Sequence, residues 1–262
     1  MATPRILILR TAGTNCDLET AFAFEKAGGK AERLHINELK IRPERLADFQ
    51  ILVLPGGFTY GDDIASGKIL ANELRTTLAG QIDKFLAEGK LILGICNGFQ
   101  VLVKAGLLPR LEPGETSIEA TLTINDSTKF EDRWVYLKTL QSRSIWTRGL
   151  PPIIYLPVAH GEGKFIPRDK AILTRLKKEK LIVFQYVNEK GALAGYPHNP
   201  NGSVENIAGI SDTTGRVLGL MPHPERHINF TQHPCWTRLK KKSKPDGLAI
   251  FKNGVDYARE KL

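Results

Sequence analysis

The hydrophobic and polar positions of the first hundred residues predict an alternation of short strands and helices. Strands are expected at 6–10, 31–35, 51–54 and 91–95. Helices are expected at 16–27, 68–87 and 99–104. The run at 51–54 is apolar throughout, which is typical of a strand buried on both faces. Strands that alternate with helices predict a mostly parallel central sheet with helices on both faces.

The pattern changes after about residue 116. Strand-like segments follow one another without long helices between them, at 118–124, 134–137, 153–158 and 181–187. We interpret them as antiparallel strands added at one side of the parallel sheet. A buried strand at 217–221 and a closing helix at 247–261 complete the chain. The expected fold class is therefore α/β, with residues 1–262 forming a single domain.

Composition narrows the class of protein. Hydrophobic residues make up 42% and charged residues 25% of the chain, as in ordinary globular proteins. No segment approaches the roughly 18 apolar residues of a membrane span, and the N-terminus lacks the pattern of an export signal. The three cysteines are widely spaced and form no Cys-x-x-Cys pair. We expect a cytoplasmic protein with no membrane contact, no disulfide framework and no metal site.

The net charge of +9 raises the question of nucleic-acid binding. Most basic residues are dispersed, and the main cluster, 238–244, precedes a turn signal at 245–247. The cluster has no interleaved aromatic residues, so a solvated loop is the favoured interpretation. The charge also suits an acidic protein partner. We expect no nucleic-acid partner.

One segment superficially resembles a nucleotide-binding loop. Gly61 to Ile69 contains the glycines and lysine of a phosphate loop, but one residue too many separates the glycines. Ile69 also stands where a magnesium-binding Ser or Thr is required. We therefore expect this chain to carry out hydrolysis or transfer without binding ATP or another cofactor itself.

The strongest chemical signal is Cys96. It lies between a predicted strand and a predicted helix, with Gly94 and Gly98 two residues to either side. This is the arrangement of a nucleophile elbow, in which a tight turn raises the side chain at the carboxyl edge of a sheet. The adjacent helix N-terminus favours the reactive thiolate. Taken alone, the pattern fits a small buried cysteine in an ordinary turn equally well.

A second segment supplies the other groups that cysteine chemistry requires. His223 directly follows the strand at 217–221, so it is expected at the same sheet edge as Cys96, and Glu225 lies two residues further on. A histidine base oriented by a carboxylate completes a nucleophilic triad. A turn with a surface histidine is the alternative. Cys96 and His223 both follow predicted strands of one sheet, which favours the triad Cys96, His223 and Glu225.

Acyl transfer also needs hydrogen-bond donors for an oxyanion. The backbone N–H of Asn97 follows the nucleophile directly. Gly56 and Gly57 follow the strand at 51–54. Because glycine has no side chain, their backbone amides can approach a substrate closely. The alternative is an ordinary glycine-rich turn.

Together these motifs resemble a known family. The motifs 94–100, 55–58 and 221–226 resemble those of the class I (triad) glutamine amidotransferases, which have a flavodoxin-like fold. The stretches 13–17, 56–63, 159–163 and 195–203 look like those of the glutaminase subunits of phosphoribosylformylglycinamidine synthases. The resemblance covers nearly the whole chain. Two departures are a longer segment at 227–244 and His198 in place of an acidic residue.

The resemblance implies a mechanism. Cys96 attacks the side-chain amide of glutamine, His223 protonates the departing ammonia, and Glu225 orients His223. The N–H groups of Gly57 and Asn97 hold the oxyanion. Water then hydrolyses the glutamyl thioester.

More weakly, the resemblance implies further site residues. Gly56, Phe58 and Gln100 are expected in the substrate pocket. His160 and Glu162 are expected at the pocket mouth or at a partner interface, and a purely structural turn is an equal alternative for them.

The resemblance also implies partners. Ammonia passes to a synthetase subunit, where ATP and magnesium are used to convert formylglycinamide ribonucleotide to the amidine in purine biosynthesis. A small third subunit bridges the other two. Two alternatives remain at this point: a free-standing cysteine peptidase or γ-glutamyl hydrolase, and a basic RNA-binding or scaffold protein with a degenerate site.

Overall fold

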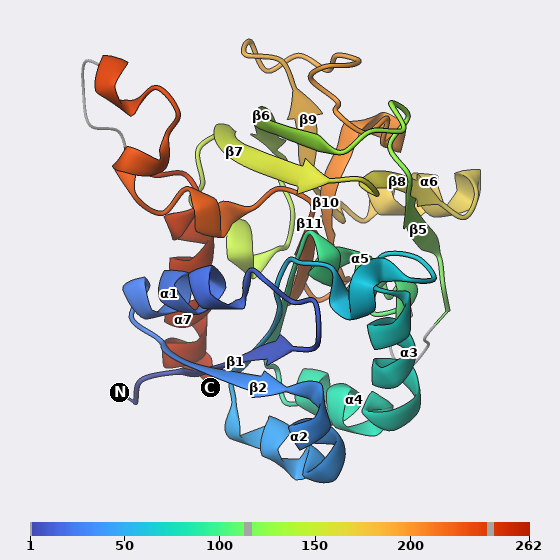
Figure 1. The fold of residues 1–262 in the computed structure, drawn as a ribbon, viewed down its shortest axis with the longest axis vertical. Helices are drawn as coiled ribbons and strands as arrows, with labels where there is room; N and C mark the ends of the chain where they lie inside the picture. The colour runs from blue at the N-terminus through green and yellow to red at the C-terminus, as the bar shows by residue number, and fades with distance from the viewer. Residues whose placement is uncertain (1, 113–116, 240–243) are drawn as a thin grey trace.

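The computed structural model describes residues 2–112, 117–239 and 244–262. Its centre is a nine-stranded sheet in the order β2-β1-β3-β4-β11-β10-β9-β6-β7 (Figure 1). The strands are β1 (Arg5–Arg10), β2 (Lys30–His35), β3 (Ile51–Leu54), β4 (Leu91–Ile95), β6 (Glu131–Thr139), β7 (Ile153–His160), β9 (Ile182–Val187), β10 (Ile207–Ser211) and β11 (Val217–Leu220).

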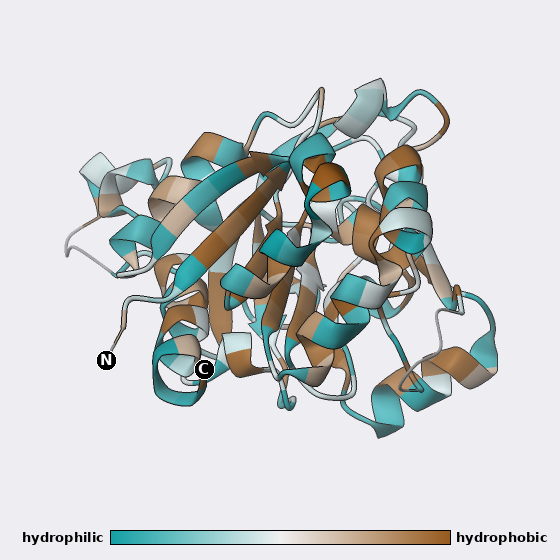
Figure 2. Cartoon of the chain, turned by 90° about the horizontal axis from the view of Figure 1, so that it is seen from below, coloured by the Kyte–Doolittle hydropathy of each residue, from teal (hydrophilic) through white to brown (hydrophobic). Residues whose placement is uncertain are grey.

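The half of the sheet from β2 to β11 is parallel. Every residue of β3, β4 and β11 is buried, as the apolar runs predict. Figure 2 shows that the strands at the centre of the molecule are largely hydrophobic. Strand β11 pairs with β4 so that Leu220 lies opposite Ile95. The chain therefore leaves both strands at the same level, which places the residues after Ile95 beside those after Leu220.

The other half of the sheet is antiparallel, from β11 through β10, β9 and β6 to β7. This confirms the antiparallel additions at one side. One expectation was wrong: the strand predicted at 118–124 is β5 (Ala120–Thr123), which pairs with β8 (Lys164–Pro167) in a separate two-stranded sheet. β10 was not predicted.

The helices are α1 (Asp17–Lys26), α2 (Ile36–Ile41), α3 (Lys68–Thr77), α4 (Ala79–Ala87), α5 (Asn97–Lys104), α6 (Lys170–Lys178) and α7 (Leu248–Lys261). Helices α1 and α7 pack together on one side of the sheet, where Phe24 meets Phe251 edge to face. Helices α3 and α5 contact each other on the other side (Figure 1). Apolar faces of both pairs turn inward, which buries one hydrophobic core.

Two helix predictions need correction. The single helix expected at 68–87 is broken into α3 and α4 at Leu78, whose φ and ψ are −116° and 6°. Leu78 is buried, and Gly80, a poor helix former, follows it. Helix α6 was not predicted, although Asp169 caps it by accepting a hydrogen bond from the Ile172 N–H at 2.9 Å.

The segment after β11 forms short 3-10 turns that pack over the antiparallel strands. The rings of His227 and His233 lie 5.2 and 5.8 Å from that of Trp134 on β6. Most of the basic cluster predicted as a solvated loop, 240–243, lies outside the described residues. Within the described part of the chain, no helix combines the length and apolar character needed to cross a bilayer.

Candidate active site

A cavity of about 150 Å³ opens at the carboxyl edge of the parallel strands. Its lining comes from the segments that follow β1, β3, β4 and β11, from the end of β7 and from the residue before β6. The lining residues are Asn15, Cys16, Gly57, Phe58, Cys96, Phe130, Ala159, His223 and Arg226. Crevices at this edge are where ligands bind in open α/β sheets.

Cys96 has the backbone geometry of the predicted elbow. Its φ and ψ are 51° and −106°, a conformation that costs free energy for a residue with a side chain. A hydrogen bond of 2.8 Å from its N–H to the Leu220 carbonyl helps to hold this turn. The turn also requires glycine at position 98, because a Cβ there would lie 1.8 Å from the Leu54 carbonyl oxygen. The thiol is directed into the cavity, with Sγ 3.6 Å from the Ala159 carbonyl oxygen.

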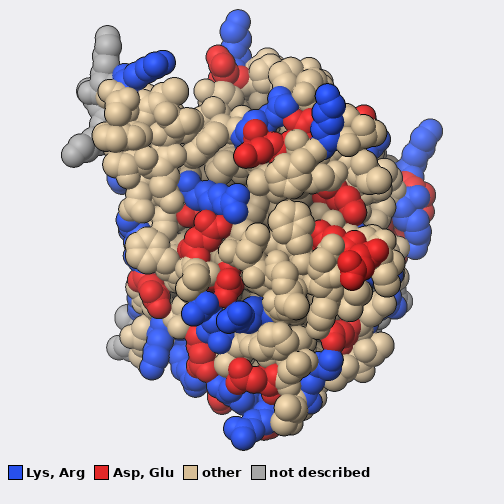
Figure 3. Space-filling view, in the orientation of Figure 1, with Lys and Arg blue, Asp and Glu red and all other residues tan. Residues whose placement is uncertain are grey.

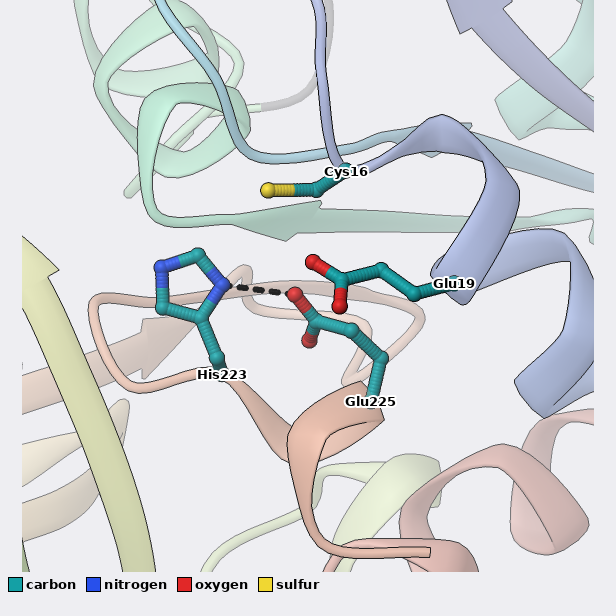
Figure 4. A group of neighbouring side chains, drawn as sticks. All are labelled: Cys16, Glu19, His223 and Glu225. Carbon is teal, nitrogen blue, oxygen red and sulfur yellow. Dashed lines mark hydrogen bonds and ion pairs between the residues drawn. The ribbon is translucent and has the colours of Figure 1, made fainter.

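His223 and Glu225 form a buried pair beside the cavity. Nδ1 of His223 lies 2.6 Å from Oε1 of Glu225 (Figure 4). The backbone N–H of His223 donates a hydrogen bond to the Pro157 carbonyl oxygen of β7 at 2.8 Å, which fixes the backbone at this position. Nε2 is left without a hydrogen-bond partner among the described residues. The pair therefore orients the imidazole and leaves one nitrogen free for proton transfer.

The charges around His223 set its proton affinity. Burial of the ring lowers its pKa, but the Glu225 carboxylate, together with the nearby Cys96 sulfur, more than offsets burial and raises the pKa well above its usual range. These neighbouring groups therefore stabilise the imidazolium form of His223.

The two residues predicted to donate backbone N–H groups to an oxyanion differ in position: Gly57 lines the cavity, and Asn97 directly follows the lining residue Cys96. Asn97 begins α5 directly after Cys96. Its side chain accepts from the Thr59 N–H at 3.3 Å and donates to Asp62 at 3.2 Å, which ties the elbow to the loop after β3. Gly57 lines the cavity with a φ of 141°, and it forms an isolated β-bridge with Thr14.

Of the three residues predicted for the substrate pocket, one contributes a side chain to the cavity. Phe58 lines it, is 45% exposed, and stacks on Phe130 with ring centroids 6.4 Å apart. Gly56 lies behind the wall, where a Cβ would meet His223 Cε1 at 2.8 Å and Cys16 Sγ at 3.0 Å. Gln100 is buried, is not among the lining residues, and donates to the Glu162 carbonyl oxygen.

His160 does not lie at a pocket mouth or on a surface. It is 3% exposed, and its Nδ1 lies 3.2 Å from Oδ1 of Asn125. Burial away from water lowers its pKa to about 3. His160 is the last residue of β7, and its contacts with Asn125 and Asn201 account for its burial.

Glu162 also belongs to a largely internal network. Its carboxylate accepts from the Ser66 N–H at 3.3 Å and pairs with the buried ammonium of Lys104 at 3.4 Å. The side chain is 22% exposed. These bonds favour the structural alternative for Glu162.

Sequence reasoning gave no role to Cys16 and Arg226. Arg226 Nη2 lies 3.3 Å from Cys16 Sγ and 3.0 Å from the Glu19 carboxylate. The available signal was position: Cys16 follows β1, so it reaches the same sheet edge as Cys96. Among the described residues, one group of donors could hold a metal ion: Cys16, Glu19, His223 and Glu225.

The surface charge is mixed on the face shown in Figure 3, where Lys and Arg alternate with Asp and Glu. No continuous basic patch covers this face. The excess of positive charge is thus dispersed here, as the sequence predicts.

Comparisons with known proteins agree with this geometry. Residues 3–258 match the family model of the CobB/CobQ-like glutamine amidotransferase domain. The chain is 48% identical over 261 residues to phosphoribosylformylglycinamidine synthase subunit PurQ of Dehalococcoides mccartyi, covering 99% of this chain and 100% of that protein. It is 42% identical to the same subunit of Methanococcus maripaludis, with 97% of each chain covered.

The fold resembles a solved complex as well. A chain of the PurLQS structure from Thermotoga maritima superposes with a TM-score of 0.74 and 30% identity, covering 98% of this chain and 99% of that one. The chain therefore belongs to the glutamine amidotransferase family, and within it to the PurQ subunits of phosphoribosylformylglycinamidine synthase.

Proposed function

We propose that this chain is the glutaminase subunit of a phosphoribosylformylglycinamidine synthase and that Cys96, His223 and Glu225 are its catalytic triad. The main observation in support of the triad is that Cys96 and His223 line the same cavity. Nδ1 of His223 also lies 2.6 Å from Oε1 of Glu225. A nucleophile, a base and an orienting carboxylate are the groups that amide hydrolysis through a thioester requires.

The first half of the reaction forms the thioester. His223 takes the proton of the Cys96 thiol, and the thiolate attacks the carbon of the glutamine side-chain amide. The N–H groups of Asn97 and Gly57 stabilise the oxyanion. The C–N bond breaks as His223 returns the proton to nitrogen, so ammonia leaves and a glutamyl thioester remains on Cys96.

The second half releases glutamate. His223 removes a proton from water, and the hydroxide attacks the thioester carbon. The C–S bond breaks, the thiolate regains its proton from His223, and glutamate departs. Glu225 holds the ring in one orientation throughout and stabilises the imidazolium. No cofactor of this chain enters either half.

The proposal extends to the fate of ammonia. It passes to a synthetase partner, which uses ATP and magnesium to convert formylglycinamide ribonucleotide to the amidine. A small bridging subunit completes the complex. Support comes from the relatives, which are named as subunits of this synthase, and from the similar chain in the solved PurLQS structure.

Glutamine hydrolysis by the purified chain, with and without the synthetase, tests this assignment. Hydrolysis without acceptor wastes glutamine, and the backbone of Gly56–Gly57 carries no side chains that hold its amides toward the oxyanion. A partner that favours the donating orientation raises the rate through differential affinity alone. Correct placement of the donors is worth on the order of 10²-fold.

We expect weak hydrolysis by the isolated chain and a rate about 10²-fold higher with the synthetase, its nucleotide and its acceptor. A pull-down with the synthetase should recover both chains. Full activity of the isolated chain, without stimulation, would instead support the free-standing γ-glutamyl hydrolase.

A further inference from the structure

We propose that Cys16, Glu19, His223 and Glu225 form a binding site for a borderline-soft divalent cation such as Zn²⁺, and that the bound ion switches the active site off. One donor atom from each residue lies within 4.8 Å of the others (Figure 4). Thiolate, imidazole and carboxylate are the ligands that Zn²⁺ takes in proteins, and four of them complete a tetrahedral shell.

The backbone holds these residues together without an ion. Cys16 and Glu19 lie at the start of α1, and His223 and Glu225 follow β11. The Cys16 N–H donates to the Gly56 carbonyl at 3.3 Å, and the His223 N–H donates to Pro157 at 2.8 Å. Each segment is thus fixed by its own backbone hydrogen bond at the carboxyl edge of the sheet, so the fold brings the four residues together without an ion.

Glu225 gives an independent indication that a ligand belongs here. The residue is 1% exposed, and its Oε2 has no hydrogen-bond partner among the described residues. A buried acceptor without a partner destabilises the folded protein. Oε1 of Glu225 is already hydrogen-bonded to Nδ1 of His223, so Oε2 is available to bind a cation.

The shell must contract to bind zinc. Bonds of 2.0–2.3 Å place tetrahedral ligands roughly 3.5 Å apart, so the donors must draw in by about 1 Å. Glu19 has the freedom to make most of this movement, because its side chain is 37% exposed. Cys16, His223 and Glu225 are buried and provide the fixed side of the site.

Arg226 is the cation that the cluster holds in this structure. Its guanidinium lies 3.3 Å from Cys16 Sγ and 3.0 Å from Glu19. The Arg226 side chain is 35% exposed, so it has room to turn toward solvent when an ion enters. Two protons leave on binding, one from the thiol and one shared by His223 and Glu225.

An ion in this position stops the proposed reaction. It binds the His223 imidazole and the Glu225 carboxylate, so His223 can no longer act as the base that the proposed mechanism requires. This inhibitory consequence rests on the proposed glutaminase function. The binding of the ion does not.

Binding is tested on the whole chain with Co²⁺, which reports a bound thiolate by charge-transfer absorption. Cys96→Ser with Cys235→Ser leaves Cys16 as the one thiol of the 262-residue sequence. We expect this double variant to give the thiolate band and a further Cys16→Ser change to abolish it. Glu19→Gln should weaken Co²⁺ binding by on the order of 10- to 100-fold. The matched control, Glu25→Gln on the exposed side of α1, should not.

Inhibition is tested by Zn²⁺ titration of glutaminase activity in the complete synthase, each variant being compared with its own metal-free rate. Cys16→Ser should raise the half-inhibitory Zn²⁺ concentration by on the order of 100-fold. Equal sensitivity of Cys16→Ser and the unmodified chain would place the ion at Cys96 and overturn the proposal. Absence of the cobalt band in the double variant would overturn it even if the chain proves not to be a glutaminase.

Discussion

At the scale of single residues, Cys96 and His223 are held in place by hydrogen bonds that are present without substrate. The positive φ of Cys96 is maintained by the hydrogen bond to Leu220, and His223 is held by Pro157 and Glu225. The nucleophile and the base are therefore placed before substrate arrives, which removes part of the entropic cost of reaction.

His223 and Glu225 are expected to contribute unequally to the rate of glutamine hydrolysis. His223→Ala removes the proton carrier and should lower glutaminase kcat by on the order of 10⁴-fold or more, nearly as much as loss of the nucleophile, because triad members act as a unit. Glu225→Gln keeps the proton carrier and should cost less. Single-turnover hydrolysis in the complete synthase measures both. Rates for both variants close to that of the unmodified enzyme would refute the triad.

His160 predicts a pH dependence of stability. Its pKa is about 3 in the folded chain and about 6.5 when unfolded. The folded pKa is the lower one, so its contribution is complete above pH 6.5 and is lost as pH falls toward 3. The free energy of unfolding should fall by about 1.4 kcal/mol per pH unit in this window from this group alone.

Replacement of His160 by Gln should remove that slope. Denaturant unfolding at several pH values between 6.5 and 4.5 measures it, and His198→Gln, at a partly exposed position, is the matched control. An unchanged pH slope in His160→Gln would show that the burial of His160 has no role in acid unfolding.

At the scale of secondary-structure elements, the site depends on the close approach of α5 to β3. A Cβ at position 98 would lie 1.8 Å from the Leu54 carbonyl oxygen, so Gly98→Ala must push the helix away from the strand. We expect a loss of about 1–3 kcal/mol in stability and a fall in kcat, because Cys96 moves with the helix.

Gly80→Ala on α4 is the comparison for this change. Nothing lies within 4 Å of a Cβ at position 80. Alanine there should stabilise the protein by up to about 1 kcal/mol and leave kcat unchanged. Equal effects of the two substitutions on melting temperature and kcat would contradict the close-packing explanation.

The elements that sequence analysis predicted are those with strong local signals. Strand β3 was predicted with its exact ends, since all of its residues are apolar and buried. The hydrophobic pattern predicts one continuous helix through Leu78, but the structure has two helices. Tertiary packing of the buried Leu78 outweighs the local sequence pattern there. The pairing of β5 with β8 joins residues more than forty apart, and such pairings leave no local trace.

At the scale of the whole molecule, the site is assembled from segments far apart in sequence. Cys96 and His223 were predictable because each follows a buried strand, and the register of β11 on β4 brings them together. Cys16 and Arg226 lie within the stretches 13–17 and 221–226 that resemble the family, but no local pattern around either side chain indicates that the two lie together beside His223. The burial of His160 depends on contacts with Asn125 and Asn201, which sequence spacing does not reveal.

The central claim is that Cys96 releases ammonia for use by a synthetase partner. The most direct test compares glutamine with ammonia as nitrogen source for synthesis by the assembled complex carrying Cys96→Ala. Cys235→Ala, at an exposed cysteine outside the site, is the control. We predict that Cys96→Ala abolishes glutamine-dependent synthesis and keeps ammonia-dependent synthesis, whereas Cys235→Ala keeps both. Glutamine use by Cys96→Ala at a rate comparable to that of the unmodified complex would contradict the account.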